Sequence, residues 1–506
     1  MLPRRRRSAG CGCRGSGVAF SSVTGVAGDS AARHDTGPGV LRSRAEAEAY
    51  VASVCFKHGP PKLVGVELEW MLYRPETPDA PVDVDSLRAA LGPHAPKSLD
   101  PDSPALPLPG GADVTVEPGG QIEIAGPPLP DLGSLLRDVT RDADRLHALL
   151  AAHGLRPHAR AADPVRPARR LLDLPRYRAM ERVFDRVGPH GRSGMCSTSS
   201  VQVCLDAGTE ASAPKRWDAL HALGPVLVAA FANSPVMHGR VTGWKSSRMA
   251  SWLSLDPART APPSVSPDPA RTWAERVVST PLLCVRGDGS WEVPPQTSFA
   301  DWIDGAARGR FDGALSRPPT TGDLDYHVST MFPPVRPHGH LEVRYVDGQD
   351  GRDWALPTAV LLALTSDAAV LDRVREACDP VRDRWVAASR DALADPALAR
   401  AAATVFPLAC EVLGRSADAG RGTGLAWGPS ELLARLEEVT EQRVLRGRCP
   451  ADDPSPLEVG APAAGAPQTP FPAGLSLPGP TTTRPEVVPP DVTSTTGRPH
   501  VQEGAV

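Results

Sequence analysis

The sequence predicts an α+β fold in which helices pack around an antiparallel β-sheet that keeps one face polar. Two observations predict it. The first is a strand–turn–strand pattern at 113–125, where apolar and polar residues alternate on both sides of Pro118-Gly119-Gly120, as in a tight hairpin. The second is that the same alternation recurs in three distant stretches of the chain, among longer segments with helical periodicity. Together they predict strands gathered into one sheet.

The hairpin at 113–125 has one apolar face, formed by its valines and isoleucines. Its other face carries Glu117 near the turn and Gln121 and Glu123 just beyond it, because side chains two residues apart point the same way in a strand. An antiparallel sheet with one solvated face has the same pattern. The hairpin alone therefore does not identify a site.

Three further stretches repeat this division between an apolar and a polar face. Their polar positions are Glu67 and Glu69 in 63–70, Ser200, Gln202 and Cys204 in 199–205, and His340, Glu342 and Arg344 in 340–345. If the strands share a sheet, five glutamates gather on one surface: Glu67, Glu69, Glu117, Glu123 and Glu342. Crowded carboxylates stay ionised only where cations are supplied. An oxygen-rich cluster without a His/Cys set suits Mg²⁺ or Mn²⁺, and Mg²⁺ commonly binds together with substrate phosphates.

A basic segment at 233–260 is the second candidate for chemistry. It places Arg240, Lys245, Arg248 and Arg259 among glycines, serines and two tryptophans. Cations beside a carboxylate cluster are suited to clamp an anionic substrate or a phosphoryl group in transfer. A basic surface loop is the alternative that the pattern leaves open.

Helix signals are clear in several places. Ser43 and Glu46 have capping-box spacing, which predicts a helix to about Phe56, and Asp131 caps a helix that ends at Gly154. Further helices are expected at 177–187 and 214–232, and a helix followed by a buried strand at 273–285. The stretch 75–109 is rich in Pro, Asp and Gly, which predicts long loops.

The two ends of the chain differ in composition from the rest. Residues 1–40 contain Arg4 to Arg7 followed by Gly, Ser and Ala, and residues 450–506 are rich in Pro and Thr. Neither segment has enough apolar residues to offset the entropy of ordering, so both are expected to be disordered. One large domain is expected at 41–449, with residues 354–446 mostly helical.

The overall composition narrows the class of protein. The net charge of −4 does not favour a nucleic-acid-binding surface, and four arginines near a flexible end are usually solvated. No run of 18 apolar residues occurs, so no membrane span is expected. Nine scattered cysteines without CxxC or zinc spacing fit a reducing compartment. A cytoplasmic protein is therefore expected; its oligomeric state cannot be predicted.

Six sequence blocks carry a resemblance to a known family. They read V-G-V-E-L-E-W, V-T-V-E-P-G-G-Q-I-E-I-A-G, S-V-Q-V-C-L-D, A-N-S-P-V-M-H-G, S-R-M-A-S-W with D-P-A-R-T, and H-V-S-T-M-F-P-P-V-R with L-E-V-R. In this order, over about residues 43–348, they resemble the glutamate-cysteine ligases of the plant and bacterial type, particularly the branch that begins ergothioneine biosynthesis.

The resemblance implies a glutamine-synthetase-like carboxylate-amine ligase fold and ATP- and Mg²⁺-dependent chemistry. Glutamate would be activated as γ-glutamyl phosphate, and the amine of cysteine would displace phosphate to give γ-glutamylcysteine. The small-molecule partners implied are glutamate and cysteine. Two alternatives stay open: a ligase for another amine, and a non-catalytic relative that binds nucleotide or metal.

The resemblance also implies roles for individual residues. Expected metal ligands are Glu69, Glu117, Glu123 and Glu342. Expected ATP contacts are Glu67, Glu69, Lys245 and Arg344. Expected substrate contacts are Gln121, Gln202, Arg248, Trp252 and Arg259, with Arg248 and Arg344 also expected to be catalytic. Cys204 departs from the family pattern, because asparagine is usual at this position.

Overall fold

The computed structural model describes residues 39–419 and 428–458, together with Phe471. Its centre is a six-stranded antiparallel sheet in the order β3-β4-β1-β6-β10-β9. The strands are β1 Val64–Trp70, β3 Asp113–Val116, β4 Ile122–Ala125, β6 Ser200–Leu205, β9 Val335–Pro337 and β10 Leu341–Asp347. The four predicted strand regions therefore share one sheet, and the predicted α+β class is confirmed. Most of the two terminal segments expected to be disordered lies outside the described residues.

The register of the sheet sets the polar side chains side by side. Glu69 of β1 is opposite Glu123 of β4, and Glu67 is opposite Gln202 of β6. Glu342 of β10 is opposite Cys204 of β6. Because opposite residues in a sheet point to the same face, polar positions from four strands lie on one surface, as the alternation predicted.

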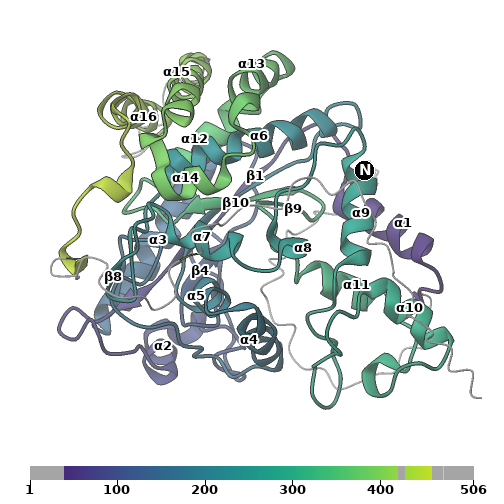
Figure 1. The fold of residues 1–506 in the computed structure, drawn as a ribbon. Coiled ribbons are helices and arrows are strands. Elements are labelled where there is room, and N and C mark those ends of the chain that lie inside the picture. Colours follow the sequence, from purple (N-terminus) through teal and green to yellow (C-terminus); the bar gives the residue numbers. More distant parts are fainter. Residues whose placement is uncertain (1–38, 420–427, 459–470, 472–506) are drawn as a thin grey trace, which may run out of the picture.

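The apolar face of the sheet is covered by helices. Tyr345 is fully buried there, and its hydroxyl donates to the carbonyl of Leu220 at 3.0 Å in α6 (Ala213–Phe231). α12 (Ala355–Leu364) packs on β6. Figure 1 shows these helices with the others of the C-terminal scaffold stacked on this side. The other scaffold helices are α13 Ala368–Cys378, α14 Trp385–Asp391, α15 Pro396–Ala419 and α16 Pro429–Gln442.

The polar face looks toward a second set of helices (Figure 1). These are α1 Arg44–Cys55, α4 Pro175–Val187, α5 His190–Cys196, α7 Ser247–Leu253 and α11 Thr321–Val328. The remaining elements are α2 Val84–Leu91, α3 Leu132–Ala152, α8 Pro257–Thr260, α9 Pro269–Ser279, α10 Phe299–Ala307, β2 Leu72–Tyr73, β5 Arg156–Pro157, β7 Val236–Met237 and β8 Arg240–Val241.

Both predicted N-cap residues act as caps, although the carboxylate of Glu46 accepts from the N–H of Arg42 instead of closing the capping box on Ser43. The hydroxyl of Ser43 accepts from the backbone N–H of Glu46 at 3.2 Å at the start of α1. The carboxylate of Asp131 accepts from the backbone N–H of Ser134 at 2.8 Å at the start of α3. Each bond satisfies a donor that the first helical turn leaves unpaired.

Three local predictions need correction, and the alternative of a surface loop at 233–260 is excluded. The stretch 75–109 is not all loop, because Asp83 caps α2. The strand expected near Val285 is absent from the described sheets; residues 282–285 are buried, but only Pro281 forms a bridge, with Ser298. The basic segment 233–260 is not a surface loop, since it contains α7 and α8. The predicted C-terminal boundary is too early, because residues 450–458 form two helical turns.

In the described chain, the stretch Pro396–Arg415 of α15 is long and apolar enough to cross a membrane. The bent pair Ala355–Leu364 and Ala368–Val381 also meets this criterion if counted as one span. α15 packs against α6, α12 and α16 within the scaffold. Core helices meet the same criterion, so these stretches are weak evidence of a membrane segment.

Candidate active site

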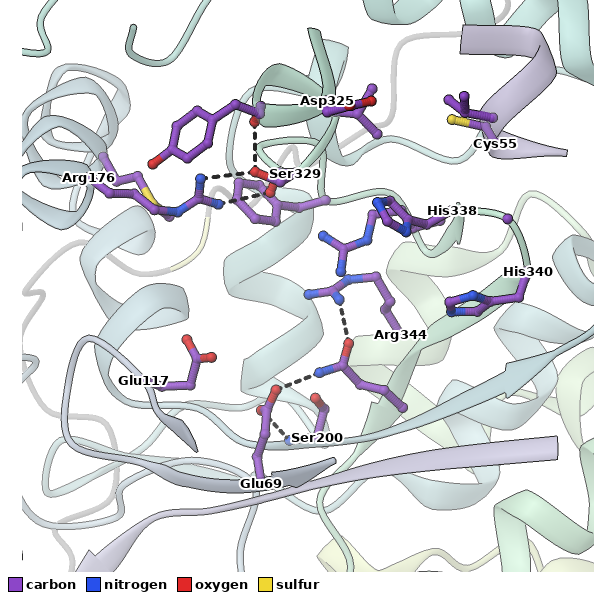
Figure 2. Close-up of a pocket in the computed structure, with 18 of the residues that line it drawn as sticks. Cys55, Glu69, Glu117, Arg176, Ser200, Asp325, Ser329, His338, His340 and Arg344 are labelled. Carbon is purple, nitrogen blue, oxygen red and sulfur yellow. Dashed lines mark hydrogen bonds between the residues drawn. The ribbon is translucent and has the colours of Figure 1, made fainter. Parts of the chain in front are cut away.

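A cavity of about 1920 Å³ lies between the polar face of the sheet and the helices that face it. Figure 2 shows side chains from both sides pointing into it. Pockets for single small ligands usually measure about 300–1000 Å³. The cavity is thus large enough for a nucleotide and smaller molecules together.

Its floor is acidic: Glu69 and Glu117 line the cavity. Glu67 and Glu123 do not border it but lie beside them on the same face of the sheet, and we call these four glutamates the carboxylate floor. Burial, followed by the charges of Glu123 and Glu342, raises the pKa of Glu67 well above its usual value. Burial, Glu123 and Glu69 do the same to the pKa of Glu117. These shifts mean that Glu67 and Glu117 give up a proton less readily than exposed carboxyls, first because they are buried and then because other carboxylates lie near. A divalent cation bound beside them would favour their ionised form.

Glu69 is held in place by hydrogen bonds from β6. It accepts from the backbone N–H of Ser200 at 2.9 Å and from the side-chain amide of Gln202 at 2.6 Å. The amide oxygen of Gln202 in turn accepts from Arg344. Figure 2 shows this chain from Glu69 at the floor to Arg344 near the middle of the cavity. One amide thereby links a carboxylate and a guanidinium.

Glu342 has a different environment from the carboxylate floor. Nε and Nη2 of Arg336 each donate to it at 2.9 Å, and Arg344 donates to the same carboxylate. Burial acts to raise its pKa, but Arg336 and Arg344 outweigh burial and lower the pKa to about 2. Glu342 is therefore ionised and compensated by arginines in the structure.

The donor chemistry of the floor fits Mg²⁺, since it is built from carboxylate oxygens. Within the described residues, no three Asp, Glu, His or Cys side chains converge as ligands of one ion. Mg²⁺ commonly retains several waters and binds through one or two carboxylates together with substrate phosphates. The open arrangement is therefore compatible with an ion that arrives with a nucleotide.

Arg248 and Trp252 lie on α7 and line the cavity. Arg248 is 4% exposed, and its Nη2 donates to the carbonyl of Arg344 at 2.7 Å. Burial lowers its pKa, which Asp347 opposes. The Trp252 ring packs on Phe332, with centroids 5.3 Å apart.

Gln121 also borders the cavity, but its amide is occupied. Its nitrogen donates to the carbonyls of Met195 at 3.2 Å and Thr198 at 3.0 Å, and its oxygen accepts from the N–H of Gly119 at 3.0 Å. It fixes the hairpin turn against the end of α5. Its evident contribution is the shape of the wall near Glu117.

Five predicted site residues do not border the cavity. Glu67, Glu123 and Glu342 lie beside it on the polar face of the sheet, whereas Lys245 and Arg259 have partners elsewhere. The ammonium group of Lys245 pairs with Asp452 at 2.5 Å, on the C-terminal segment. Arg259 is 1% exposed, and it donates to Thr330 and to the carbonyl of Pro281. Spacing placed both near Arg248, but α7 and α8 turn their side chains to other partners.

Several cationic side chains at the cavity were not identified from the sequence. Arg176 donates to the carbonyl of Ser329 at 2.9 Å, and the guanidinium groups of Arg176 and Arg286 lie 5.0 and 4.8 Å from the ring centre of Tyr326. Arg336 lies in the V-R block before β10, a signal that the motif contained. Arg176 comes from an arginine-rich stretch that gave no such signal.

The lining of the cavity contains more cationic than acidic side chains. Its described cationic lining residues are Lys57, Lys62, Lys97, Arg176, Arg248, Arg286, Arg336 and Arg344, and its acidic ones are Glu69, Glu117, Asp206 and Asp325. The excess of cations suits a ligand that carries several negative charges. Cys204 lies on the same face of the sheet, where burial and the nearby Glu67 and Glu342 raise the pKa of its thiol well above the usual value.

Comparison with known proteins gives consistent results. The model of glutamate-cysteine ligase family 2 matches residues 63–463. The glutamate–cysteine ligase EgtA of Mycobacterium tuberculosis is 35% identical over 82% of this chain and 90% of its own length. EgtA of Mycolicibacterium smegmatis is 38% identical over 75% of this chain and 88% of its own length.

Among solved structures, the glutamate–cysteine ligase of Francisella tularensis in complex with AMP covers 78% of this chain and 84% of its own. Its TM-score is 0.44 and its sequence identity 12%.

Proposed function

Because the chain belongs to glutamate-cysteine ligase family 2, we propose that it joins the γ-carboxyl group of glutamate to the amino group of cysteine with consumption of ATP. The product is γ-glutamylcysteine, with ADP and phosphate released. The observation that carries the proposal is one cavity in which an acidic floor faces a cluster of arginines. The EgtA relatives and the ergothioneine-type motifs favour ergothioneine biosynthesis as the destination of the product.

The reaction is written in two balanced steps. A γ-carboxylate oxygen of glutamate bonds to the γ-phosphorus of ATP as the bond from that phosphorus to ADP breaks. The cysteine amine then attacks the acyl carbon of γ-glutamyl phosphate, phosphate leaves with the carboxylate oxygen, and the nitrogen loses a proton. Phosphoryl transfer of this kind depends on positioning and charge stabilisation, so the protein need not supply a nucleophile.

The arginines of the cavity are placed to perform that stabilisation. Arg248 and Arg344 approach each other at the main chain of β10, where the Arg248 guanidinium contacts the Arg344 carbonyl. We assign Arg248 to the transferred phosphoryl group and glutamate, and Arg344 to the phosphates of ATP. Arg336, which shares Glu342 with Arg344, joins them as a phosphate contact.

The carboxylate floor is the proposed site for Mg²⁺. Glu69, Glu117 and Glu123 would hold the ion together with Glu342, and Glu67 would act beside Glu69 toward Mg²⁺-ATP. Bound there, Mg²⁺ supplies positive charge to the phosphate oxygens. Glu342 has to exchange arginine contacts for the ion, because both of its oxygens accept from Arg336 in the structure.

The remaining side chains orient the organic substrates. Gln202 keeps Glu69 and Arg344 in fixed relation, and Trp252 forms an apolar wall beside Arg248. Lys245 and Arg259 are assigned no ligand contact, because their side chains have other partners away from the cavity.

The test is ADP release that requires both amino acids and Mg²⁺. We expect Glu117→Gln and Arg248→Ala to reduce kcat by at least about 100-fold, the range found when one charge-stabilising group is removed. Matched controls are Glu411→Gln and Arg415→Ala, an exposed scaffold pair that should retain wild-type rates.

If the wild type releases ADP with glutamate and another amine but not with cysteine, that amine replaces cysteine as the proposed substrate. Nucleotide binding without ADP release for any amino-acid pair would show a non-catalytic relative. Full activity in both site variants would refute the assigned site.

A further inference from the structure

A β-bulge interrupts β10 beside the cavity. The strand pairs with β6 through Glu342 and Val343, and pairing resumes at Val346 and Asp347 with a shifted register. Bulges insert an unpaired residue and re-aim the side chains that follow, and they are frequent next to active sites. Glu342 is opposite Cys204 and Asp347 is opposite Ser200, so both lie on the polar face of the sheet. In an uninterrupted strand, residues five apart would point to opposite faces.

The carboxylate of Asp347 is buried, 2% exposed, and has several hydrogen-bond donors. One oxygen accepts from the backbone N–H of Asn233 at 2.9 Å and from the hydroxyl of Ser234 at 2.8 Å. The other accepts from the hydroxyl of Ser246 at 2.8 Å and lies 3.7 Å from Nη1 of Arg248. Asp347 does not itself border the cavity.

These contacts connect both ends of the segment between α6 and α7, residues 232–246. Ser246 caps α7 by accepting from the N–H of Met249 at 3.1 Å, and the hydroxyl of Ser234 accepts from the N–H of Arg248 at 3.1 Å. Asp347 bonds to both serine hydroxyls. It therefore determines where α7 begins, and with it the direction in which Arg248 leaves the helix.

We propose that Asp347, placed on the polar face by the bulge in β10, is a positioning residue that aims the guanidinium of Arg248 into the cavity. The proposal rests on the function assigned above, in which Arg248 contacts the transferred phosphoryl group. Asp347 acts through Arg248 and does not contact the substrates. If the effects of substituting Asp347 and Arg248 on the activation free energy were additive, they would be inconsistent with this role.

The test is Asp347→Asn in the full-length chain, alone and combined with Arg248→Lys. The amide retains the size of the side chain but replaces one acceptor by a donor. We expect kcat to fall by about 100-fold, the cost of misplacing a reacting or stabilising group by about 1 Å, with KM for ATP within about three-fold. In the Arg248→Lys background the same change should cost less than about five-fold.

The matched control is Asp353→Asn, which breaks a pair with Arg435 in the scaffold. It should leave kcat unchanged in both backgrounds. If Asp347→Asn does not fold, Ser246→Ala replaces it, since this variant removes one donor to the same carboxylate.

If Asp347→Asn or Ser246→Ala reduces kcat by the same factor in the Arg248→Lys background as in the wild type, the positioning role is overturned. A wild-type rate in Asp347→Asn would also overturn it. Each kcat is expressed relative to that of a wild type that releases ADP. A wild type without any ADP release refutes the proposed function instead, so the two failures are distinguishable.

Discussion

Charged and titratable side chains in the interior have partners that spacing alone did not reveal. The alternation in the strands correctly placed Glu67, Glu69 and Gln202 on one face, because that face depends only on local period. It did not reveal Asp347, since a bulge reverses the phase of β10. Lys245 was placed in the cavity because the direction of a side chain just before a helix cap cannot be read from spacing.

Buried histidines make stability depend on pH. Nδ1 of His221 donates to the carbonyl of Trp217 at 2.8 Å, and the centroids of the two rings lie 4.4 Å apart. Burial lowers its pKa to about 4, whereas an unfolded histidine titrates near 6.5. The unfolded state therefore gains a proton first as pH falls. The stability that neutral His221 retains above pH 6.5 is lost progressively down to about pH 4.

We expect His221→Phe, which cannot titrate, to remove this dependence. Between pH 7 and pH 4, the unfolding free energy of the wild type should fall by about 3 kcal/mol more than that of the variant. Urea unfolding at a series of pH values measures the difference. Parallel stability curves for the two proteins would contradict the assignment.

At the scale of elements, the hairpin turn between β3 and β4 is the most constrained segment near the site. The N–H of Gly120 donates to the carbonyl of Glu117 at 2.9 Å, and Gly120 has φ of +90°. A Cβ on Gly119 would lie 2.0 Å from the carbonyl oxygen of Cys196 in α5. The glycines thus allow the turn that carries Glu117 to pack directly against a helix end.

Gly119→Ala should destabilise the protein by at least about 2 kcal/mol, because the overlap is with main chain that cannot rotate away. It should also reduce ADP release, since Glu117 moves with the turn. Gly289→Ala, at an exposed position with open space around it, is the control and should be neutral. Thermal unfolding of both variants decides; equal Tm values would contradict the packing described.

The elements that sequence reasoning identified were those with local signals. The hairpin, α1 and α3 have turn or capping residues at fixed offsets, and the structure confirms them. α2 was missed because its Pro- and Asp-rich surroundings resemble loop, although Asp83 provides a cap. β9 was missed because its three residues, Val335–Pro337, are too short for a period to show.

At the scale of the whole molecule, the C-terminal segment is tied to the core far from it in sequence. Nε and Nη2 of Arg160 each donate to the carboxylate of Glu458 at 2.9 Å, and the two side chains are only 6% and 11% exposed. Arg160 also donates to the amide of Asn233 at 2.7 Å. Composition could not predict that the C-terminal segment packs on the core, because this packing depends on an ion pair between one residue of a proline-rich stretch and a distant arginine.

Glu458→Ala should lower the unfolding free energy by about 3 kcal/mol, because it leaves a buried guanidinium without its carboxylate. The control, Glu411→Ala, breaks an exposed pair and should cost less than about 1 kcal/mol. Urea unfolding measures both. A cost for Glu458→Ala no greater than that of the control would show that the segment does not contribute to the core.

At the scale of the whole molecule, the proposed ligation requires a nucleotide and glutamate to meet between the carboxylate floor and the arginines. The most direct measurement uses glutamate labelled with ¹⁸O in its γ-carboxyl group, with ATP, Mg²⁺ and cysteine. Transfer of phosphate to that carboxyl group predicts one labelled oxygen in each phosphate released, as read by mass spectrometry. Phosphate without label, formed while the peptide product accumulates, would contradict the account.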